Sequence, residues 1–365
     1  MFIKEIIKAL ENAAPPALQE DYDNAGLITG NASWPCSGIL VSLDATEAVV
    51  KEAVKKGCNL IVAHHPIVFR GLKKITGKNY VEKTVIAAIK NDIAIYAIHT
   101  NLDNVLHGVN NKIADKLSLE NRQILLPKQG VLQKLAVFVP DIHKQQLADA
   151  LFEAGAGHIG NYSECSFSAA GTGSFKGGAD TNPFVGKPGL RHNEPESRLE
   201  VIFPHWLGDK VLAAMKKAHP YEEVAYDLYP LENVYENTGS GMIGTLRRPM
   251  ETLAFLNQLK TIFKVPVVKH TRILKKKVKK IAICGGSGSF LTAAAIGAGA
   301  DIFVTADVKY HEFFDANEQL VLADIGHYES EQYTIDLLFE VLKQNFPTFA
   351  VQKTVVNTNP VKYLC

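Results

Sequence analysis

Two stretches of the chain share one strand-helix-strand pattern, and this repeat constrains the fold more than any other feature. Residues 39–65 predict an apolar strand, a helix that ends at Gly57 and a second apolar strand. Residues 281–307 match them without a gap at an offset of 242, with Gly299 at the position of Gly57. Parallel strands joined by a helix are the repeating unit of α/β proteins. Because the apolar pattern and the glycine coincide, we expect an α/β fold with two related halves.

The segment between the halves has a different character. From about residue 130 to residue 237 the pattern predicts strand, helix, strand, strand, helix and strand, which is the ferredoxin-like order. KLAVFVP and RLEVIFP within it are near copies, and each precedes a helix. The Gly- and Pro-rich stretch at 176–195 is expected to be a mobile loop. We therefore expect an inserted α+β domain at 127–239 and a core formed by 1–126 and 240–365.

Composition excludes several classes of protein. With 39 basic and 38 acidic residues among 365, the chain lacks the electrostatic footprint of a nucleic-acid or membrane-surface binder. No apolar run reaches membrane-spanning length, and the N-terminus has helical spacing without a signal-peptide cleavage pattern, which favours the cytoplasm. The five cysteines are scattered and form no CxxC, as expected of reduced thiols rather than of disulfides or a zinc finger.

The stretch LIVAHHP places two histidines at the end of a buried strand. Pro66 ends the apolar run, so His64 and His65 lie at the carboxyl end of the strand, where open α/β sheets bind ligands. Neighbouring residues of a strand point to opposite faces, so the pair is suited to two adjacent metal ions rather than to one. The alternative is a pair of hydrogen-bonded histidines in a turn. Metal binding therefore requires further ligands.

Candidate ligands follow strands in both halves. Asp103 comes after the strand IAIYAIH, and His327 and Glu331 are four residues apart at the start of a predicted helix, on one face. For the last two, the alternative is a histidine at a helix start and a solvated glutamate. Three histidines and two carboxylates suit a pair of divalent ions with a bridging carboxylate. The candidate metal ligands are His64, His65, Asp103, His327 and Glu331.

His99 and a glycine-rich loop can each be interpreted in two ways. His99, just before Asp103, is a candidate catalytic residue that carries a proton or orients a ligand, or else a buried hydrogen-bonded histidine. The loop CGGSGSF joins a strand to a helix and offers backbone amides to a phosphate, or else its glycines permit close packing. It does not complete a GxGxxG motif.

Four motifs in order, YDNAGL, VAHHP, HTNLD and GHYESE, resemble the dinuclear-metal-centre hexamer family, called Nif-three-like, whose members are known as GTP cyclohydrolase I type-two homologues. The resemblance covers roughly residues 1–126 and 240–365. The family usually has tryptophan before its Asp-Asn pair, where this chain has Tyr22. Carried over position by position, the family's ligands fall on the same five residues, and Glu331 corresponds to the bridge.

The resemblance also implies partners, cofactors and an activity. It implies two divalent ions per subunit, with zinc as the first expectation and iron, manganese or cobalt as alternatives. It implies a homohexamer of two stacked trimers, with an insert similar to the PII and CutA proteins. Metal-dependent hydrolysis of a nucleotide or related heterocycle, such as GTP ring opening, is the expected activity. The alternative is a ring assembly without catalysis that handles metal or has a regulatory role.

Overall fold

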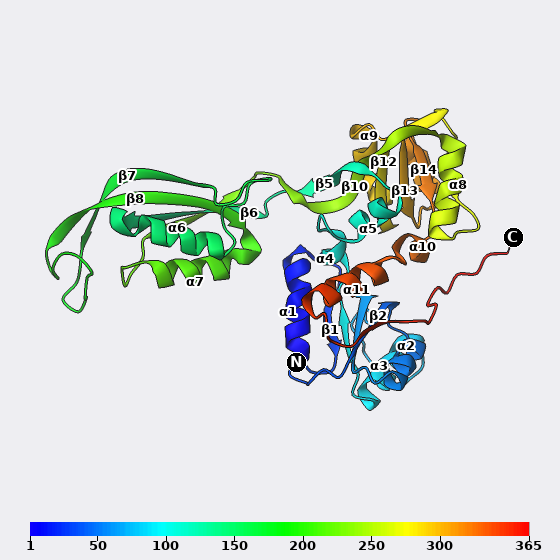
Figure 1. The fold of residues 1–365 in the computed structure, drawn as a ribbon, viewed down its shortest axis with the longest axis horizontal. Helices are drawn as coiled ribbons and strands as arrows, with labels where there is room; N and C mark the ends of the chain where they lie inside the picture. The colour runs from blue at the N-terminus through cyan, green and yellow to red at the C-terminus, as the bar shows by residue number, and fades with distance from the viewer. Residues whose placement is uncertain (365) are drawn as a thin grey trace. The chain divides into compact units, whose positions relative to one another are not determined.

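The computed structural model describes residues 1–364, which form two compact units (Figure 1). The split unit consists of Met1–Pro127 and Asn237–Cys365, and the middle unit is Lys128–Glu236. The last residue of the predicted core, 365, lies outside the described residues. The protein is a mixed α/β protein with three sheets.

The first sheet of the split unit has five strands, of which four are parallel. Their order is β1 (Gly26–Thr29), β4 (Ala94–Ala97), β3 (Leu60–His65), β2 (Ile39–Asp44) and β15 (Val351–Lys353). Helices cover both faces, with α2 and α3 on one side and α1 and α11 on the other (Figure 1). Their bounds are α1 (Ile3–Ala13), α2 (Glu47–Lys55), α3 (Tyr80–Lys90) and α11 (Thr334–Asn345). Because both faces are covered, β2 and β3 are buried along all but their last residue, and their first residues are continuously apolar rather than alternating.

The second sheet of the split unit has six strands, and its central β12, β13 and β14 are parallel. The order is β11 (Lys269–His270), β14 (Val321–Asp324), β13 (Ile302–Ala306), β12 (Lys277–Ser287), β10 (Tyr235–Glu251) and β5 (Glu120–Lys128). The remaining helices of the split unit are η1 (Pro16–Leu18), α4 (Thr100–Asp103), α5 (Val109–Lys116), α8 (Thr252–Phe263), η4 (Ser289–Leu291), α9 (Thr292–Gly297), η5 (Tyr310–Ala316) and α10 (His327–Glu331). One buried cluster contains residues of both sheets, including Ile39 and Ile281, so the two sheets share a core.

The two strand-helix-strand segments detected in the sequence have the same strand register. Ile39 pairs with Leu60 in the first sheet, and Ile281 pairs with Ile302 in the second. The paired residues are therefore separated by the same number of residues in the two segments. Gly57 and Gly299, at equivalent positions after the two helices, have φ values of 67° and 71°. This left-handed conformation favours glycine, which explains why the same residue recurs there.

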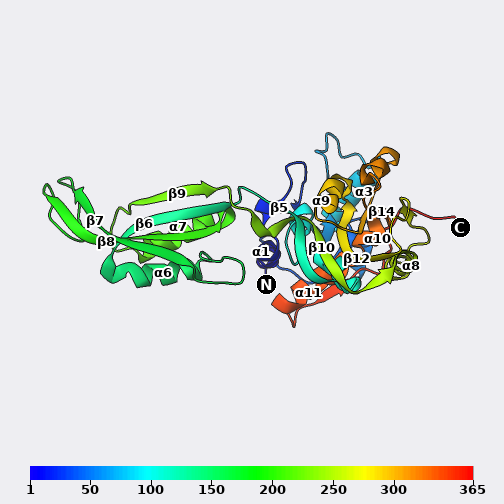
Figure 2. The same ribbon diagram turned by 90° about the horizontal axis from the view of Figure 1, so that it is seen from above.

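The middle unit is a four-stranded antiparallel sheet with two helices on one side (Figures 1 and 2). The strand order is β7 (Ser166–Lys176), β8 (Arg191–Pro204), β6 (Leu132–Pro140) and β9 (Tyr226–Leu231). The helices are η2 (Asp141–His143), α6 (Lys144–Glu153), η3 (His205–Leu207) and α7 (Gly208–Ala218). Residues such as Leu135, Leu151 and Phe203 form a separate core between sheet and helices.

The hairpin of β7 and β8 is longer than the sequence predicts. The expected loop at 176–195 is shorter, because Arg191 already pairs with Lys176 and β8 continues without interruption to Pro204. Pro195 lies in this strand although proline lacks an amide hydrogen, and it pairs with Thr172. The polar composition of 191–197 concealed the strand, because β7 itself is largely exposed and requires no apolar alternation there.

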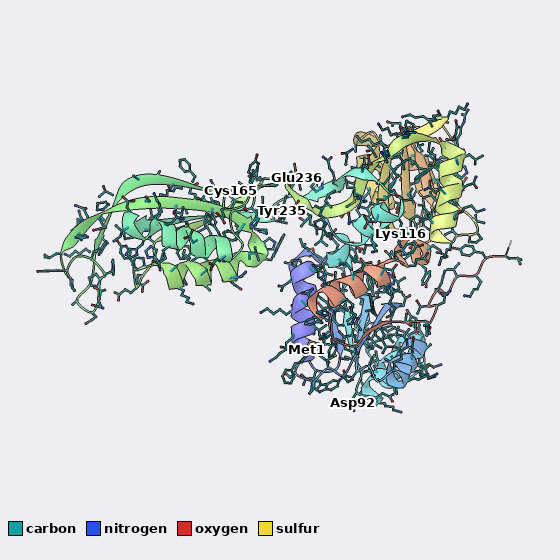
Figure 3. All side chains as sticks on the ribbon, in the orientation of Figure 1. Met1, Asp92, Lys116, Cys165, Tyr235 and Glu236 are labelled. Atoms are coloured by element: carbon teal, nitrogen blue, oxygen red, sulfur yellow. The ribbon has the colours of Figure 1, made fainter. Side chains whose placement is uncertain are left out.

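The cysteines that the structure describes are all free, in accord with their scattered spacing. They are Cys36, Cys58, Cys165 and Cys284, and Cys165 is labelled in Figure 3. None of the described helices combines the length and the apolar character that a membrane span requires.

Candidate metal centre

The two histidines of β3 lie at its carboxyl end, as the sequence predicts, and their side chains are held by different neighbours. His64 is fully buried, and its Nδ1 donates a hydrogen bond to the carbonyl of Ile98 at 2.8 Å. His65 is half-buried, and its Nδ1 lies 2.8 Å from Oδ1 of Asp44. Asp44 ends β2 and stands opposite His65 in the strand register. Both imidazoles are therefore fixed through Nδ1, which leaves Nε2 available to a ligand.

The segment after β4 supplies His99 and Asp103. Asp103 is on the single-turn helix α4, not in a loop, and its Oδ1 lies 3.7 Å from His64 Nε2. Nδ1 of His99 lies 2.8 Å from Oδ1 of Asp23, and the other oxygen of Asp23 accepts hydrogen bonds from the amide and hydroxyl of Thr100. Burial alone would raise the pKa of Asp23, but its hydrogen bonds with His99 and Thr100 outweigh this and lower it to about 2.

Helix α10 carries the other two candidate ligands, His327 and Glu331, which lie far from the first three in the sequence. Gly326, with φ of 86°, turns the chain into the helix, which begins at His327 and ends at Glu331. Nδ1 of His327 lies 2.6 Å from Oδ2 of Asp307. The Glu331 side chain is buried, and its Oε2 lies 2.9 Å from His65 Nε2 and 3.1 Å from His327 Nε2. Its other oxygen, Oε1, faces His64 Nε2 at 3.9 Å.

Glu331 thus belongs to two groups of potential ligands. One consists of His64, Asp103 and Glu331, the other of His65, His327 and Glu331, and within each group the ligand atoms lie within 4.8 Å of one another. A third such group joins His99 to the two neighbouring histidines of β3. The structure therefore brings together all five residues that the sequence proposes as ligands, with His99 beside them.

Two buried polar atoms of this cluster fit a cation. Nε2 of His64 and Oδ1 of Asp103 have no hydrogen-bond partner among the described residues. An unsatisfied buried donor or acceptor costs roughly 1–3 kcal/mol, so native proteins rarely leave two of them facing each other. Imidazole nitrogen and carboxylate oxygen are ligands for zinc and similar divalent ions. The residues present therefore fit a metal site.

Burial and neighbouring charges shift the pKa values of the candidate ligands in different directions. Burial lowers the pKa of His64 to about 3, against the attraction of the Glu331 charge. Burial also opposes the charged form of His65, but hydrogen bonds with Asp44 and Glu331 outweigh it and raise its pKa to about 9. Burial and the charge of Glu331 raise the pKa of Asp103 well above its usual range. For Glu331, burial is outweighed by the charge and hydrogen bonds of His327 and His65, which hold its pKa well below normal.

Sequence reasoning missed the aspartates that orient the histidines. Asp23, Asp44 and Asp307 each accept a hydrogen bond from a histidine Nδ1. Such carboxylates fix the tautomer and orientation of an imidazole ligand. A sequence signal existed for Asp44, because it ends the strand that neighbours the strand of His65.

The glycine-rich stretch CGGSGSF, whose first four residues form the end of β12, serves close packing. The amide of Gly285 donates to Asn110, and that of Gly286 donates to Ser330, so both amides are satisfied within the protein. A side chain at Gly286 would collide with the Glu331 carboxylate. Of the two interpretations of this loop, the structure supports packing, and the glycine is required because Glu331 occupies the adjacent space.

The cluster opens onto a cavity of about 910 Å³. Aromatic side chains from separate segments line it: Tyr22, Phe69, Tyr80 and Phe290. Its lining includes no Lys or Arg among the described residues. This volume lies within the range of small-molecule sites, which are commonly apolar with a few polar groups.

Comparison with known proteins identifies the family. The model of the Duf34/NIF3 family (NGG1p interacting factor 3) matches residues 1–360. The chain belongs to this family. A relative from Halalkalibacterium halodurans, named GTP cyclohydrolase 1 type 2 homolog, is 41% identical over 364 residues, covering 98% of each chain. A Bacillus subtilis protein of the same name is 41% identical over 327 residues, 89% of this chain and 88% of its own. The crystal structure of a Bacillus cereus protein related to NIF3 is similar with a TM-score of 0.87 and 38% identity, covering 100% of this chain and 99% of that one.

Proposed function

We propose that the cluster is a dinuclear metal centre that performs hydrolysis on a nucleotide or a related heterocycle. The observation that carries the proposal is the position of Glu331, whose two oxygens face two separate ligand groups. His64 and Asp103 would complete one site, and His65 and His327 the other. Zinc is the first candidate, and iron, manganese and cobalt accept the same nitrogen and oxygen ligands.

Two divalent ions would supply Lewis acidity, lowering the pKa of water and stabilising a developing oxyanion. The chain's own contribution is orientation and proton transfer. Asp23, Asp44 and Asp307 hold the imidazoles of His99, His65 and His327 through Nδ1. His99 contacts the rings of both strand-end histidines, with centroids 5.2 and 5.4 Å away, and lines the cavity. We assign it the role of proton carrier, through Nε2.

The cavity lining supports a substrate with a flat ring. Tyr22 and Phe69 lie with centroids 6.4 Å apart at its wall, where they can stack on a planar heterocycle. The absence of Lys and Arg from the described lining argues against direct side-chain recognition of a triphosphate. A substrate with several phosphates would have to place them against the metal ions or outside the cavity.

We further propose an architecture and an assembly. The order of strands and helices in the middle unit supports a ferredoxin-like domain inserted at 127–239 into a core of 1–126 and 240–365. The shared register of the two strand-helix-strand segments supports two related halves in that core. The resemblance described above supports a homohexamer of two stacked trimers whose insert is similar to PII and CutA. Free cysteines support a cytoplasmic location.

The test compares wild type with Glu331→Ala, using Glu340→Ala, an exposed carboxylate of α11, as the matched control. Metal content after repletion is measured by elemental analysis, and the same samples are assayed for hydrolysis of a nucleotide panel. We expect about two ions per chain in wild type and control, and loss of most metal and of turnover in Glu331→Ala with the fold retained. Two ions without turnover of any nucleotide would favour the alternative of a metal-handling or regulatory assembly. Absence of metal in wild type would refute the centre.

A further inference from the structure

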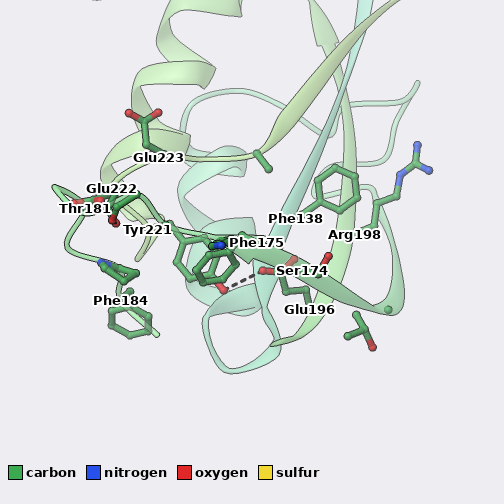
Figure 4. Close-up of a pocket in the computed structure, with 18 of the residues that line it drawn as sticks. Phe138, Ser174, Phe175, Thr181, Phe184, Glu196, Arg198, Tyr221, Glu222 and Glu223 are labelled. Atoms are coloured by element: carbon green, nitrogen blue, oxygen red, sulfur yellow. Dashed lines mark hydrogen bonds between the residues drawn. The ribbon is translucent and has the colours of Figure 1, made fainter. Parts of the chain in front are cut away.

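The middle unit contains a second cavity, of about 720 Å³, formed entirely by its own residues (Figure 4). It lies along β7 and the start of β8, and is closed by the connection after β7 and by the segment at 221–225. Its volume is that of a small-molecule site. None of the residues discussed for the metal centre contributes to it.

A buried carboxylate lies at the floor of this cavity. Glu196, on β8, is 8% exposed, and its Oε1 accepts a hydrogen bond of 2.9 Å from the hydroxyl of Tyr221, drawn as a dashed line in Figure 4. Gly173 lies on the neighbouring strand β7, two residues beyond the register partner of Glu196, and any side chain there would collide with Oε2 of Glu196. The strand thus carries glycine at the position where the carboxylate requires space.

The Glu196 carboxylate has no cationic partner among the ion pairs of the described residues. Arg198, two positions along β8 and also at the cavity, pairs with Glu200 at 2.9 Å instead. Burying a charge without a partner is costly. The Tyr221 hydroxyl contributes one neutral hydrogen bond, so the remaining acceptor positions of the carboxylate are available to a ligand.

Aromatic rings form the walls around this carboxylate. The ring of Tyr221 lies 6.0 Å from that of Phe175 and 6.3 Å from that of Phe184, between centroids. Phe138 lines the same space. Aromatic faces attract cations and stack on planar groups, worth about 0.5–2 kcal/mol for each contact.

The balance of charge in the lining is negative. Glu222 and Glu223 line the cavity together with Glu196, whereas Lys176 and the already paired Arg198 are its cations. An anionic ligand would meet this negative field, and a neutral one would leave the buried carboxylate without a charged partner. A cation satisfies both the carboxylate and the aromatic walls.

We propose that this cavity binds a small organic cation with a flat apolar body, of the amidinium class. Two parallel N–H groups of an amidinium match the two oxygens of a carboxylate, as in arginine-carboxylate pairs. The flat body would lie against the aromatic rings around Tyr221. This site is independent of the metal centre and of its proposed chemistry.

The test uses three ligands of nearly equal shape that differ in charge: benzamidine, benzamide and benzoate. Calorimetric titration of the full-length protein is expected to show saturable benzamidine binding, at least about tenfold tighter than benzamide, and no benzoate binding. Glu196→Gln is expected to weaken benzamidine about tenfold or more and to leave benzamide nearly unchanged. Glu232→Gln, an exposed carboxylate of the same unit, is the matched control.

A second variant keeps the test decisive if Glu196→Gln fails to fold. Phe184 is 52% exposed, so Phe184→Ala leaves the core intact and is expected to weaken benzamidine and benzamide alike. Equal binding of benzamide and benzamidine would overturn the proposal. So would unchanged benzamidine affinity in folded Glu196→Gln, or no binding by wild type up to about 10 mM ligand, which is weaker than the range of specific sites.

Discussion

Replacing Gly286 by alanine is a sensitive probe of the proposed metal centre, because Gly299, in the turn between α9 and β13, provides a matched control. Both residues have left-handed backbone, with φ of 61° and 71°. An L residue in this conformation is destabilised by about 1–2 kcal/mol. At Gly299 the added methyl group meets open space, so strain is its whole effect.

At Gly286 the added methyl group has a second consequence. It would overlap Oε1 of Glu331 and lie 3.3 Å from Cε1 of His327, so the carboxylate must move. Glu331 would then lose the position from which its two oxygens face His64 and His65. Disturbing the support of a metal ligand reduces affinity by roughly 10- to 100-fold, or about 1.4–2.8 kcal/mol.

Two measurements separate the effects. Urea denaturation of the metal-free proteins is expected to show a loss of stability in both variants from the shared backbone strain, and a larger loss in Gly286→Ala because the buried Glu331 carboxylate must also move. Competition with a chromophoric chelator is expected to show weakened metal binding in Gly286→Ala alone. Equal metal affinity in the two variants would refute the argument that Glu331 requires glycine beside it.

Other substitutions test orientation and packing. Asp44→Ala removes the carboxylate that holds His65 Nδ1 and is expected to weaken metal binding about 10- to 100-fold, as measured by chelator competition; unchanged affinity would contradict this role. Leu338→Ala opens a cavity in the shared core and is expected to lower the free energy of unfolding by about 2–5 kcal/mol. Ile89→Ala, 58% exposed on α3, should change it by less than about 0.5 kcal/mol, and similar urea midpoints for the two would contradict the assigned packing.

The mixed α/β class and the positions of the candidate ligands could be predicted from sequence because both depend on short-range patterns. An apolar run followed by Pro66 indicates a strand end, and the polar residues after it lie at the edge where ligands bind. The spacing of His327 and Glu331 similarly places both on one helical face, as α10 shows. That these residues bind two metal ions stays a prediction.

Among the orienting aspartates, Asp23 could not be predicted with the same rules. Asp23 and His99 are 76 residues apart, and nothing in the local pattern of either predicts their contact. The helix that carries Asp103 could not be predicted either, because a four-residue helix leaves no periodicity to detect. Glu196 and the next residue of β8, Ser197, are both buried, so the strand does not alternate there and its pattern gives little indication of a cavity.

The separation of the candidate ligands along the chain determines when the proposed metal centre could form during synthesis. His65 and Glu331 are 266 residues apart, so at about 5–20 residues per second a ribosome needs roughly 13–53 seconds to supply the second after the first. The middle unit, Lys128–Glu236, is translated completely within that interval and can fold first. Until Glu331 emerges, the nascent chain offers only part of either ligand group. For the proposed metal centre, loading with metal would therefore be a late event in maturation, and a chain truncated before α10 carries both strand-end histidines without Glu331.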